Sequence, residues 1–225
     1  MKEILISIQP QWVEKILKGE KTIEIRKTIP KCMLPCKVYV YMTKKRNFFM
    51  ANRKGEEIWF GDGLRYDKTE IVKFPKCDVQ YWHLLGKVVA EFILKKTEEY
   101  EFELWDNETF ESIGKVYYDE ETGEREVDVF ACNEDLEKTE FVKSSQLSVR
   151  DLRKYLGTGF QTCYAWHIDD LKIYDKPKEL DEFVLPNKKN CKTCFFYKDI
   201  CKNVCEEIKK HLFRPPQSWC YVESL

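Results

Sequence analysis

Three ionisable side chains of mixed sign lie within eight residues near the N-terminus. Lys21, Glu24 and Arg26 follow a glycine in a run that reads G-x-K-x-x-E-x-R. A flexible ammonium, a carboxylate and a planar guanidinium can together hold a phosphate group or the edge of a nucleobase. With its pKa lowered, Lys21 can also serve as a base or nucleophile beside Glu24. A solvated charge pair on an edge strand is the competing interpretation, and the chemistry alone favours neither.

These residues, 19–26, are called the octet, and their spacing predicts a short strand. Alternate side chains of an extended chain point to opposite faces, so the two isoleucines are expected on one face, with the acid and the guanidinium on the other. Lys21 lies two residues before Ile23, so within the strand it would point into the core with the isoleucines. We therefore expect it in the turn that Gly19 opens, with its side chain reaching Glu24. One face of the octet is then core, and the other lines a polar cleft.

The segments before the octet have clear periodicities. Residues 4–8 alternate as a strand, and Pro10 suits the first turn of a helix that ends before Gly19. Residues 38–43 predict another strand, with aliphatic side chains on one face and two tyrosine rings on the other.

Later segments carry turn and cap signals. Thr122-Gly123 predicts the turn of a hairpin, and Ser148 with Asp151 predicts a capping box that opens a helix. Residues 174–178 contain a proline and are expected to be an extended linker.

The octet resembles the signature of the ASCH (activating signal cointegrator homology) domain, a branch of the PUA-like superfamily. The strand 4–8, the helix 10–17, the run 86–92 and the run 164–171 resemble the family's lead-in, central strand and closing strand. The resemblance implies an α+β fold: a partly open PUA-like β-barrel with peripheral helices and a cleft lined by the octet.

The same resemblance implies that the chain binds RNA or a modified nucleobase. Some ASCH proteins are hydrolases, acting on N4-acetylcytidine or on RNA. Lys21 and Arg26 match the small amidohydrolases, but Glu24 stands where those enzymes have a catalytic Thr. A hydrolase that uses Lys21 and Glu24 is therefore the alternative to a binding protein.

The resemblance, together with the cysteines near the C-terminus, suggests a domain organisation. Residues 1–178 are assigned to the ASCH domain, with an insertion at about 97–160, and residues 186–225 to a small cysteine-rich helical module. A chain of 225 residues is long enough for this arrangement.

Charge is distributed unevenly, although the net charge is only −1. Residues 1–60 carry thirteen Lys and Arg against six Asp and Glu, whereas residues 98–140 carry seventeen acids against three bases. The basic part is suited to a polyanion. The acidic segment and the C-terminal cysteine-rich module are candidate docking sites for a protein partner, so a protein-docking adaptor is the second alternative function. Cations and rings interleave around residues 41–54, as expected for a surface that binds single-stranded nucleic acid. The predicted nucleic-acid-binding residues are Lys21, Glu24, Arg26, Tyr41, Lys45, Arg46 and Trp166.

Four cysteines near the C-terminus have a spacing that can hold a metal. The spacing is C-x2-C-x6-C-x3-C, and the second pair fits one turn of a helix. Two close pairs of thiolates can complete a tetrahedral zinc site, which would stabilise a module with little core. The predicted ligands are Cys191, Cys194, Cys201 and Cys205, with Cys220 as a substitute. An iron–sulfur cluster and buried free cysteines are the alternatives.

The overall composition is that of a globular protein with 34% charged and 14% aromatic residues. A secretory signal and a long apolar run are not evident, so a cytoplasmic protein without membrane contact is expected, its ten cysteines mostly reduced. The sequence leaves open which nucleobase is bound, whether the nucleic acid is RNA or DNA, and the oligomeric state.

Overall fold

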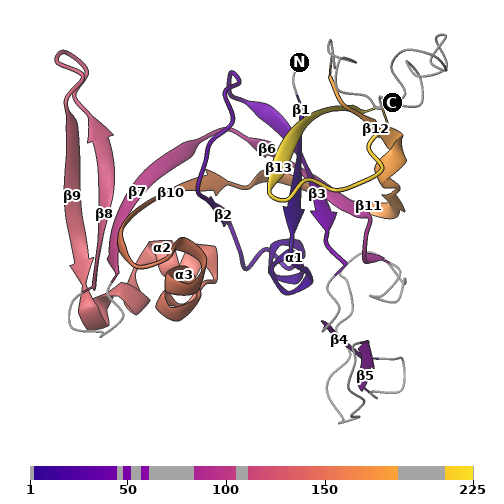
Figure 1. Ribbon diagram of the computed structural model, residues 1–225, viewed down its shortest axis with the longest axis horizontal. Helices are drawn as coiled ribbons and strands as arrows, with labels where there is room; N and C mark the ends of the chain where they lie inside the picture. The colour runs from indigo at the N-terminus through magenta and orange to yellow at the C-terminus, as the bar shows by residue number, and fades with distance from the viewer. Residues whose placement is uncertain are drawn as a thin grey trace, which may run out of the picture. The chain divides into compact units, whose positions relative to one another are not determined.

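The computed structural model describes residues 3–44, 48–51, 57–60, 84–104, 111–186 and 211–224. It contains short helices and two larger β-sheets (Figure 1). The strands are β1 (Glu3–Ile8), β2 (Ile23–Arg26), β3 (Cys36–Met42), β4 (Phe48–Ala51), β5 (Glu57–Phe60), β6 (Val88–Leu94), β7 (Thr97–Leu104), β8 (Glu111–Tyr118), β9 (Arg125–Cys132), β10 (Gly159–His167), β11 (Asp169–Lys178), β12 (Phe183–Val184) and β13 (Trp219–Ser224). The α-helices are α1 (Pro10–Leu17), α2 (Glu140–Ser145) and α3 (Val149–Leu156), and the 3-10 helices are η2 (Asn133–Lys138) and η3 (Leu180–Glu182).

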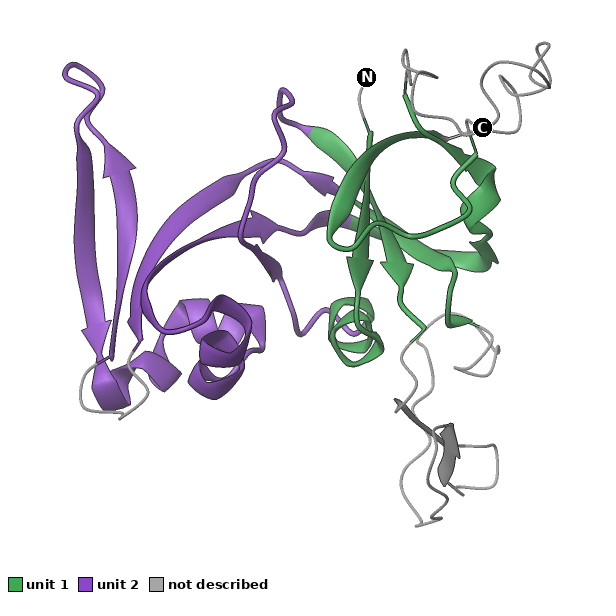
Figure 2. Cartoon of the chain, viewed as in Figure 1, with its two compact units in different colours: residues 1–17, 36–92, 171–225 green, residues 18–35, 93–170 purple. Residues whose placement is uncertain are grey.

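The chain divides into two compact units, each made of separate stretches of sequence (Figure 2). Unit 1 contains residues 1–17, 36–92 and 171–225, and unit 2 contains residues 18–35 and 93–170. The octet belongs entirely to unit 2.

Unit 1 is built on a six-stranded sheet with the order β11-β6-β3-β1-β13-β12. Strand β1 pairs in parallel with β3 and antiparallel with β13, which places the last strand of the chain next to the first. Helix α1 buries Val13, Ile16 and Leu17, as its apolar stripe predicts. Tyr39 and Tyr41 lie in a buried cluster with aliphatic and aromatic neighbours.

Unit 2 is built on a five-stranded antiparallel sheet with the order β2-β10-β7-β8-β9. Strands β8 and β9 form the predicted hairpin, and Gly123 in its turn has a φ of 72°, where glycine is favoured. The octet strand β2 is at one edge of this sheet, and β9 is at the other.

Two short helices of unit 2 pack near the octet and the central strands. Thr139 caps the N-terminus of α2, and the predicted capping box of Ser148 and Asp151 opens α3. The Phe141 ring of α2 packs edge-on against Tyr100, with ring centroids 4.6 Å apart. These helices cover apolar side chains of the sheet.

The predicted α+β architecture, a curled and partly open sheet with peripheral helices, is confirmed. One local prediction was wrong: residues 174–178 belong to strand β11 and are not a linker. The reason is that β11 is an edge strand, where Pro177 is tolerated because it need not donate to a neighbour. The predicted module 186–225 lies largely outside the described residues, but its last strand, β13, pairs with β1.

Within the described residues, none of the helices has the length and apolarity that crossing a bilayer requires.

Candidate nucleic-acid interface

The octet strand β2 pairs antiparallel with β10, and this pairing positions its charged side chains. Glu24 lies opposite Trp166, and Arg26 lies opposite Tyr164. The two isoleucines lie opposite Ala165 and His167, on the other face of the sheet. The predicted alternation of apolar and polar side chains is therefore confirmed.

Glu24 lies between two cations, as the motif predicts. One of its carboxylate oxygens, Oε2, is 3.3 Å from the Lys21 ammonium, and the other, Oε1, is 3.0 Å from the Arg26 guanidinium. The three side chains are called the octet cluster. Lys21 lies before the strand and reaches Glu24 from the turn, as expected.

Lys21 also ties the octet to the C-terminal end of α2. Its ammonium donates a hydrogen bond of 2.6 Å to the carbonyl of Ser145, the last residue of the helix. The Thr22 amide donates to the carbonyl of Ser144, 2.9 Å away. Carbonyls in the last turn of a helix have no partner within it, and the helix dipole favours a cation there. Lys21 therefore has a structural role as well as a place in the octet cluster.

The octet cluster is more enclosed than the sequence predicts. Lys21 is 2% exposed, and Glu24 and Arg26 are each 7% exposed. The face opposite the isoleucines is polar, as predicted, but it is almost completely covered. The physical reason is that α2 packs against β2, so both faces of this short strand are covered.

A ring and a cation lie at the surface next to the octet cluster. Tyr155 of α3 is 39% exposed, and Lys27 is exposed directly after β2. The Lys27 ammonium is 5.5 Å from the centroid of the Tyr155 ring and donates to the carbonyl of Leu156. Burial raises the pKa of the Tyr155 hydroxyl, Arg26 lowers it and Glu24 raises it. Lys27 follows Arg26 directly in the chain, so this part of the surface adjoins the octet cluster.

Neither Lys27 nor Tyr155 was among the predicted site residues. The periodicity of α3 places Tyr155 on the apolar face of the helix and gives no sign that a strand from elsewhere in the chain ends beside it. Lys27 follows the motif by one residue, and only the course of β2 shows that it reaches the surface beside α3.

The other predicted nucleic-acid contacts are placed differently or not described. Trp166 is 0% and Tyr41 3% exposed, so in this structure neither ring offers a free face to a base. Tyr41 belongs to the core of unit 1. Lys45 and Arg46 lie outside the described residues.

The four predicted zinc ligands, Cys191, Cys194, Cys201 and Cys205, also lie outside the described residues. Among the residues that are described, no group of three or more His, Cys, Asp or Glu is arranged to hold a metal ion. Cys220 is described: it lies on β13 opposite Leu5 and packs against the core of unit 1. Burial raises the pKa of its thiol to about 11.

A second charge cluster in unit 2 was not predicted. Glu98 of β7 accepts hydrogen bonds from Lys115 (2.6 Å) and Tyr100 (3.3 Å), lies 2.8 Å from the Lys96 ammonium, and is 2.7 Å from Nε2 of His167. These five residues are called the Glu98 cluster. The sequence could not identify it, because four of its members come from the strands β7, β8 and β10, whose register is not visible in the sequence, and Lys96 lies just before β7.

The Glu98 cluster fixes the charge of Glu98 and of Lys115. Burial raises the pKa of Glu98, but hydrogen bonds from Lys115, Lys96 and His167 outweigh this effect, and the pKa is lowered to about 2. The hydrogen bond with Glu98 raises the pKa of Lys115 despite partial burial. Glu98 therefore stays ionised and Lys115 stays protonated at neutral pH.

Comparison with solved structures shows that this chain is similar to ASCH proteins. The crystal structure of ASCH from Zymomonas mobilis matches with 17% identity and a TM-score of 0.45, over 99% of this chain and 88% of that chain. Two single-residue variants of ZmASCH match with 16% identity and a TM-score of 0.46, over 91% and 89% of their chains. No protein-family model and no curated protein sequence matches. A likeness at this level assigns no ligand or activity.

Proposed function

We propose that the chain binds single-stranded RNA or a modified nucleobase at the surface beside the octet cluster. The supporting observation is the combination of an exposed ring, Tyr155, and an exposed cation, Lys27, next to Arg26 and Glu24. Aromatic rings beside cations are the usual means of holding single strands, because rings stack on bases and cations neutralise phosphates. The resemblance of the octet to ASCH proteins points to the same class of ligand.

Each side chain has a separate part in this proposal. Tyr155 stacks on a base, and Lys27 contacts a phosphate. Arg26 and Glu24 are almost enclosed, so they contact the ligand only through their small exposed part, with the carboxylate accepting from an exocyclic amine. Lys21 positions Glu24 and fastens β2 to α2.

Hydrolysis is the alternative function, in which Lys21 and Glu24 act on an amide or a phosphodiester. It requires the Lys21 ammonium to leave the Ser145 carbonyl, because that side chain is 1% exposed where it now lies. We therefore place binding first.

The proposal is tested by titrating labelled single-stranded RNA with the full chain at two salt concentrations. Replacing Tyr155 by Ala is expected to weaken binding about tenfold, since stacking of a base on a ring contributes about 1–3 kcal/mol. Replacing Lys27 by Ala is expected to weaken binding and to reduce the slope of log affinity against log salt by about 0.7. Both side chains are at the surface, so both variants should fold.

Matched controls for this experiment are Phe160→Ala, which removes a ring that is 67% exposed in the same unit, and Lys176→Ala, which removes an exposed lysine of unit 1. Equal affinity of Tyr155→Ala and Phe160→Ala would contradict the proposal. New products from RNA or N4-acetylcytidine that disappear in Lys21→Ala would instead support the hydrolase.

We also propose, from the spacing alone, that Cys191, Cys194, Cys201 and Cys205 bind a structural zinc ion. Elemental analysis of protein purified without chelators is expected to give about one equivalent of zinc, because closed thiolate sites bind this metal tightly. Less than about half an equivalent of zinc would count against the site. One equivalent in Cys220→Ser as well would show that Cys220 is not a ligand.

A further inference from the structure

Strand β9 forms an outer edge of the sheet in unit 2. Among the described strands, only β8 pairs with it. Five of its eight residues are exposed. Proteins commonly protect a long edge with a proline or a covering segment, and the edge strand β11 of unit 1 contains Pro177. Strand β9 contains no proline, so its edge can accept a further strand.

The backbone of β9 has hydrogen-bonding groups that face away from β8. At the turn of the hairpin, the Asp119 amide donates to the Glu124 carbonyl, 2.9 Å away. In an antiparallel pair, residues alternate between those whose N–H and C=O groups face the partner strand and those whose groups face away from it. Counted from the turn, this alternation directs the backbone groups of Arg125 and Val127 outward.

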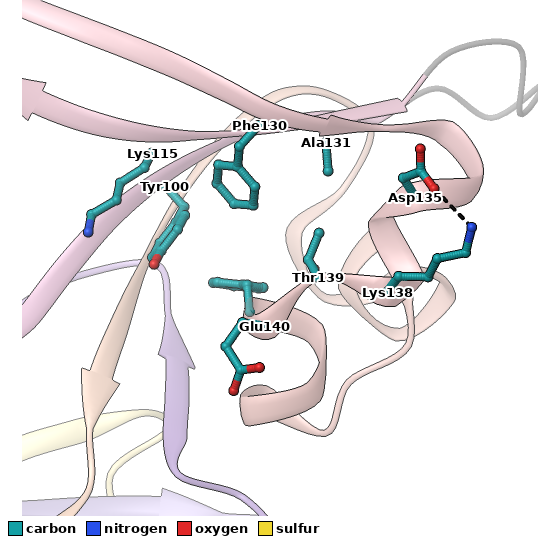
Figure 3. Close-up of a pocket in the computed structure, with 9 residues that line it drawn as sticks. Tyr100, Lys115, Phe130, Ala131, Asp135, Lys138, Thr139 and Glu140 are labelled. Carbon is teal, nitrogen blue, oxygen red and sulfur yellow. Dashed lines mark hydrogen bonds and ion pairs between the residues drawn. The ribbon is translucent and has the colours of Figure 1, made fainter.

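The other end of β9 is occupied. Two successive residues of β8, Ile113 and Gly114, pair with Ala131 and Val129. Phe130 is therefore the extra residue of a β-bulge, which ends the regular edge. Phe130 and Ala131 line a pocket together with residues of η2 and α2 (Figure 3). The regular stretch that is open to a partner therefore ends at Val129.

The side chains of this stretch are apolar on one face of the sheet and acidic on the other. Val127 and Val129 share one face, and Glu126 and Asp128 share the other. Val129 is 53% exposed, which leaves apolar surface for a partner to cover. Both acids are exposed as well.

The one cation of β9 is already engaged. The Arg125 guanidinium is 2.7 Å from the carboxylate of Glu101 and 3.7 Å from that of Glu99, both on β7. Its charge is therefore not available to Glu126 and Asp128. A second copy of this edge or a nucleic acid would bring more negative charge to these acids, whereas a strand that carries cations is attracted to them.

We infer that β9 binds an extended segment of a basic partner protein, in which lysine or arginine alternates with β-branched residues. The segment adds a strand to the sheet and bonds to the outward backbone groups of Arg125 and Val127. Its cations lie beside Glu126 and Asp128, and its apolar side chains cover the valines of β9. The octet strand β2 is at the other edge of the sheet, so this interaction does not depend on the proposed RNA interface.

A peptide of eight residues in which lysine alternates with valine is the probe. Its matched control has four lysines followed by four valines, so it has the same composition and charge but no alternation. Both peptides carry a fluorescent dye and are titrated with the full chain at low salt, and binding is followed by fluorescence anisotropy. The alternating peptide is expected to bind about fivefold more tightly than the control or better.

Two variants test the edge itself. Val127→Pro removes an outward N–H without removing a bond to β8, and is expected to weaken binding about tenfold. Glu126→Lys combined with Asp128→Lys is expected to weaken binding by about tenfold or more, because two attractive pairs become repulsive. The charge-matched control is Glu120→Lys with Glu121→Lys, in the exposed turn of the hairpin, which should weaken binding by about twofold at most.

Circular dichroism and the melting temperature show whether each variant is folded. Three results would overturn the proposal: no binding of the alternating peptide at about 1 mM, equal binding of the two peptides, or an equal loss in the two pairs of charge reversals. A chain that forms dimers, and loses them in Val127→Pro, would also overturn it and would assign the edge to a second copy.

Discussion

Unit 2 holds two carboxylates that are each paired with more than one cation, and the two clusters differ mainly in their access to water. In the octet cluster, the side chains of Lys21, Glu24 and Arg26 are 1%, 9% and 8% exposed. In the Glu98 cluster the carboxylate is equally covered, at 11%, but Lys96 and Lys115 are 61% and 28% exposed. The same kind of pairing thus occurs in a dry and in a partly hydrated setting.

This difference in exposure predicts how much stability is lost when one charged side chain is removed from each cluster. Removing one member of a buried group of charges leaves its partners without water and without compensation. Around Glu98, the cations keep part of their hydration when the carboxylate is lost. We therefore expect the octet cluster to hold β2 in place, and the Glu98 cluster to set the local charge at the surface around Lys96 and Lys115.

The largest expected effect follows from neutralising each carboxylate in turn. Glu24→Gln should lower the free energy of unfolding by about 3–5 kcal/mol, because Lys21 and Arg26 are left as buried cations. Glu98→Gln should lower it by less, about 2 kcal/mol: the fall of the Glu98 pKa from 4.5 to about 2 corresponds to at most about 3 kcal/mol, and the hydration of its cations reduces this. Urea unfolding of the two variants and the parent at neutral pH measures both values.

Salt distinguishes the cause of these two losses. At about 1 M NaCl, where charges in solvent are screened beyond about 3 Å, the effect of Glu98→Gln should shrink while that of Glu24→Gln stays nearly the same. Equal losses for the two variants, or equal responses to salt, would show that burial does not set the difference.

A smaller effect is expected in acid, and it concerns the Glu98 cluster. The pKa of Glu98 is about 2 in the folded chain and about 4.5 without its partners, so the unfolded state takes up this proton first. The stability that Glu98 contributes is therefore complete above about pH 4.5 and is lost as the pH falls toward 2.

Melting temperatures of the parent chain and Glu98→Gln, followed from neutral pH into this acid range, measure that contribution. The two curves should converge as the pH falls, because Gln has no proton to bind. Curves that stay parallel would mean that Glu98 titrates at its ordinary value in the folded chain.

The sequence was most informative where a short-range signal decides the structure. Gly19, the capping box at Ser148 and the turn at Gly123 each act over a few residues, and the structure has the predicted element at each. The octet cluster could also be predicted, because Lys21, Glu24 and Arg26 are so close in sequence that any turn followed by a strand brings them together.

The enclosure of the octet and the Glu98 cluster could not be predicted from the sequence. Both depend on segments that are distant in the chain: Ser145 covers Lys21 from 124 residues away, and His167 meets Glu98 from 69 residues away. Alternation in a strand shows which side chains share a face, but it does not show what covers that face. For the same reason, Trp166 and Tyr41 looked like rings that can stack on bases, although each lies in a core.

The pairing of β2 with β10 has a consequence for synthesis of the chain. Unit 2 takes its edge strand from residues 18–35 and the rest of its sheet from residues 93–170. Residues 27–158 are all synthesised between β2 and the strand to which it must bond. Its two isoleucines therefore stay available to chaperones from the time β2 emerges from the ribosome until β10 has emerged as well.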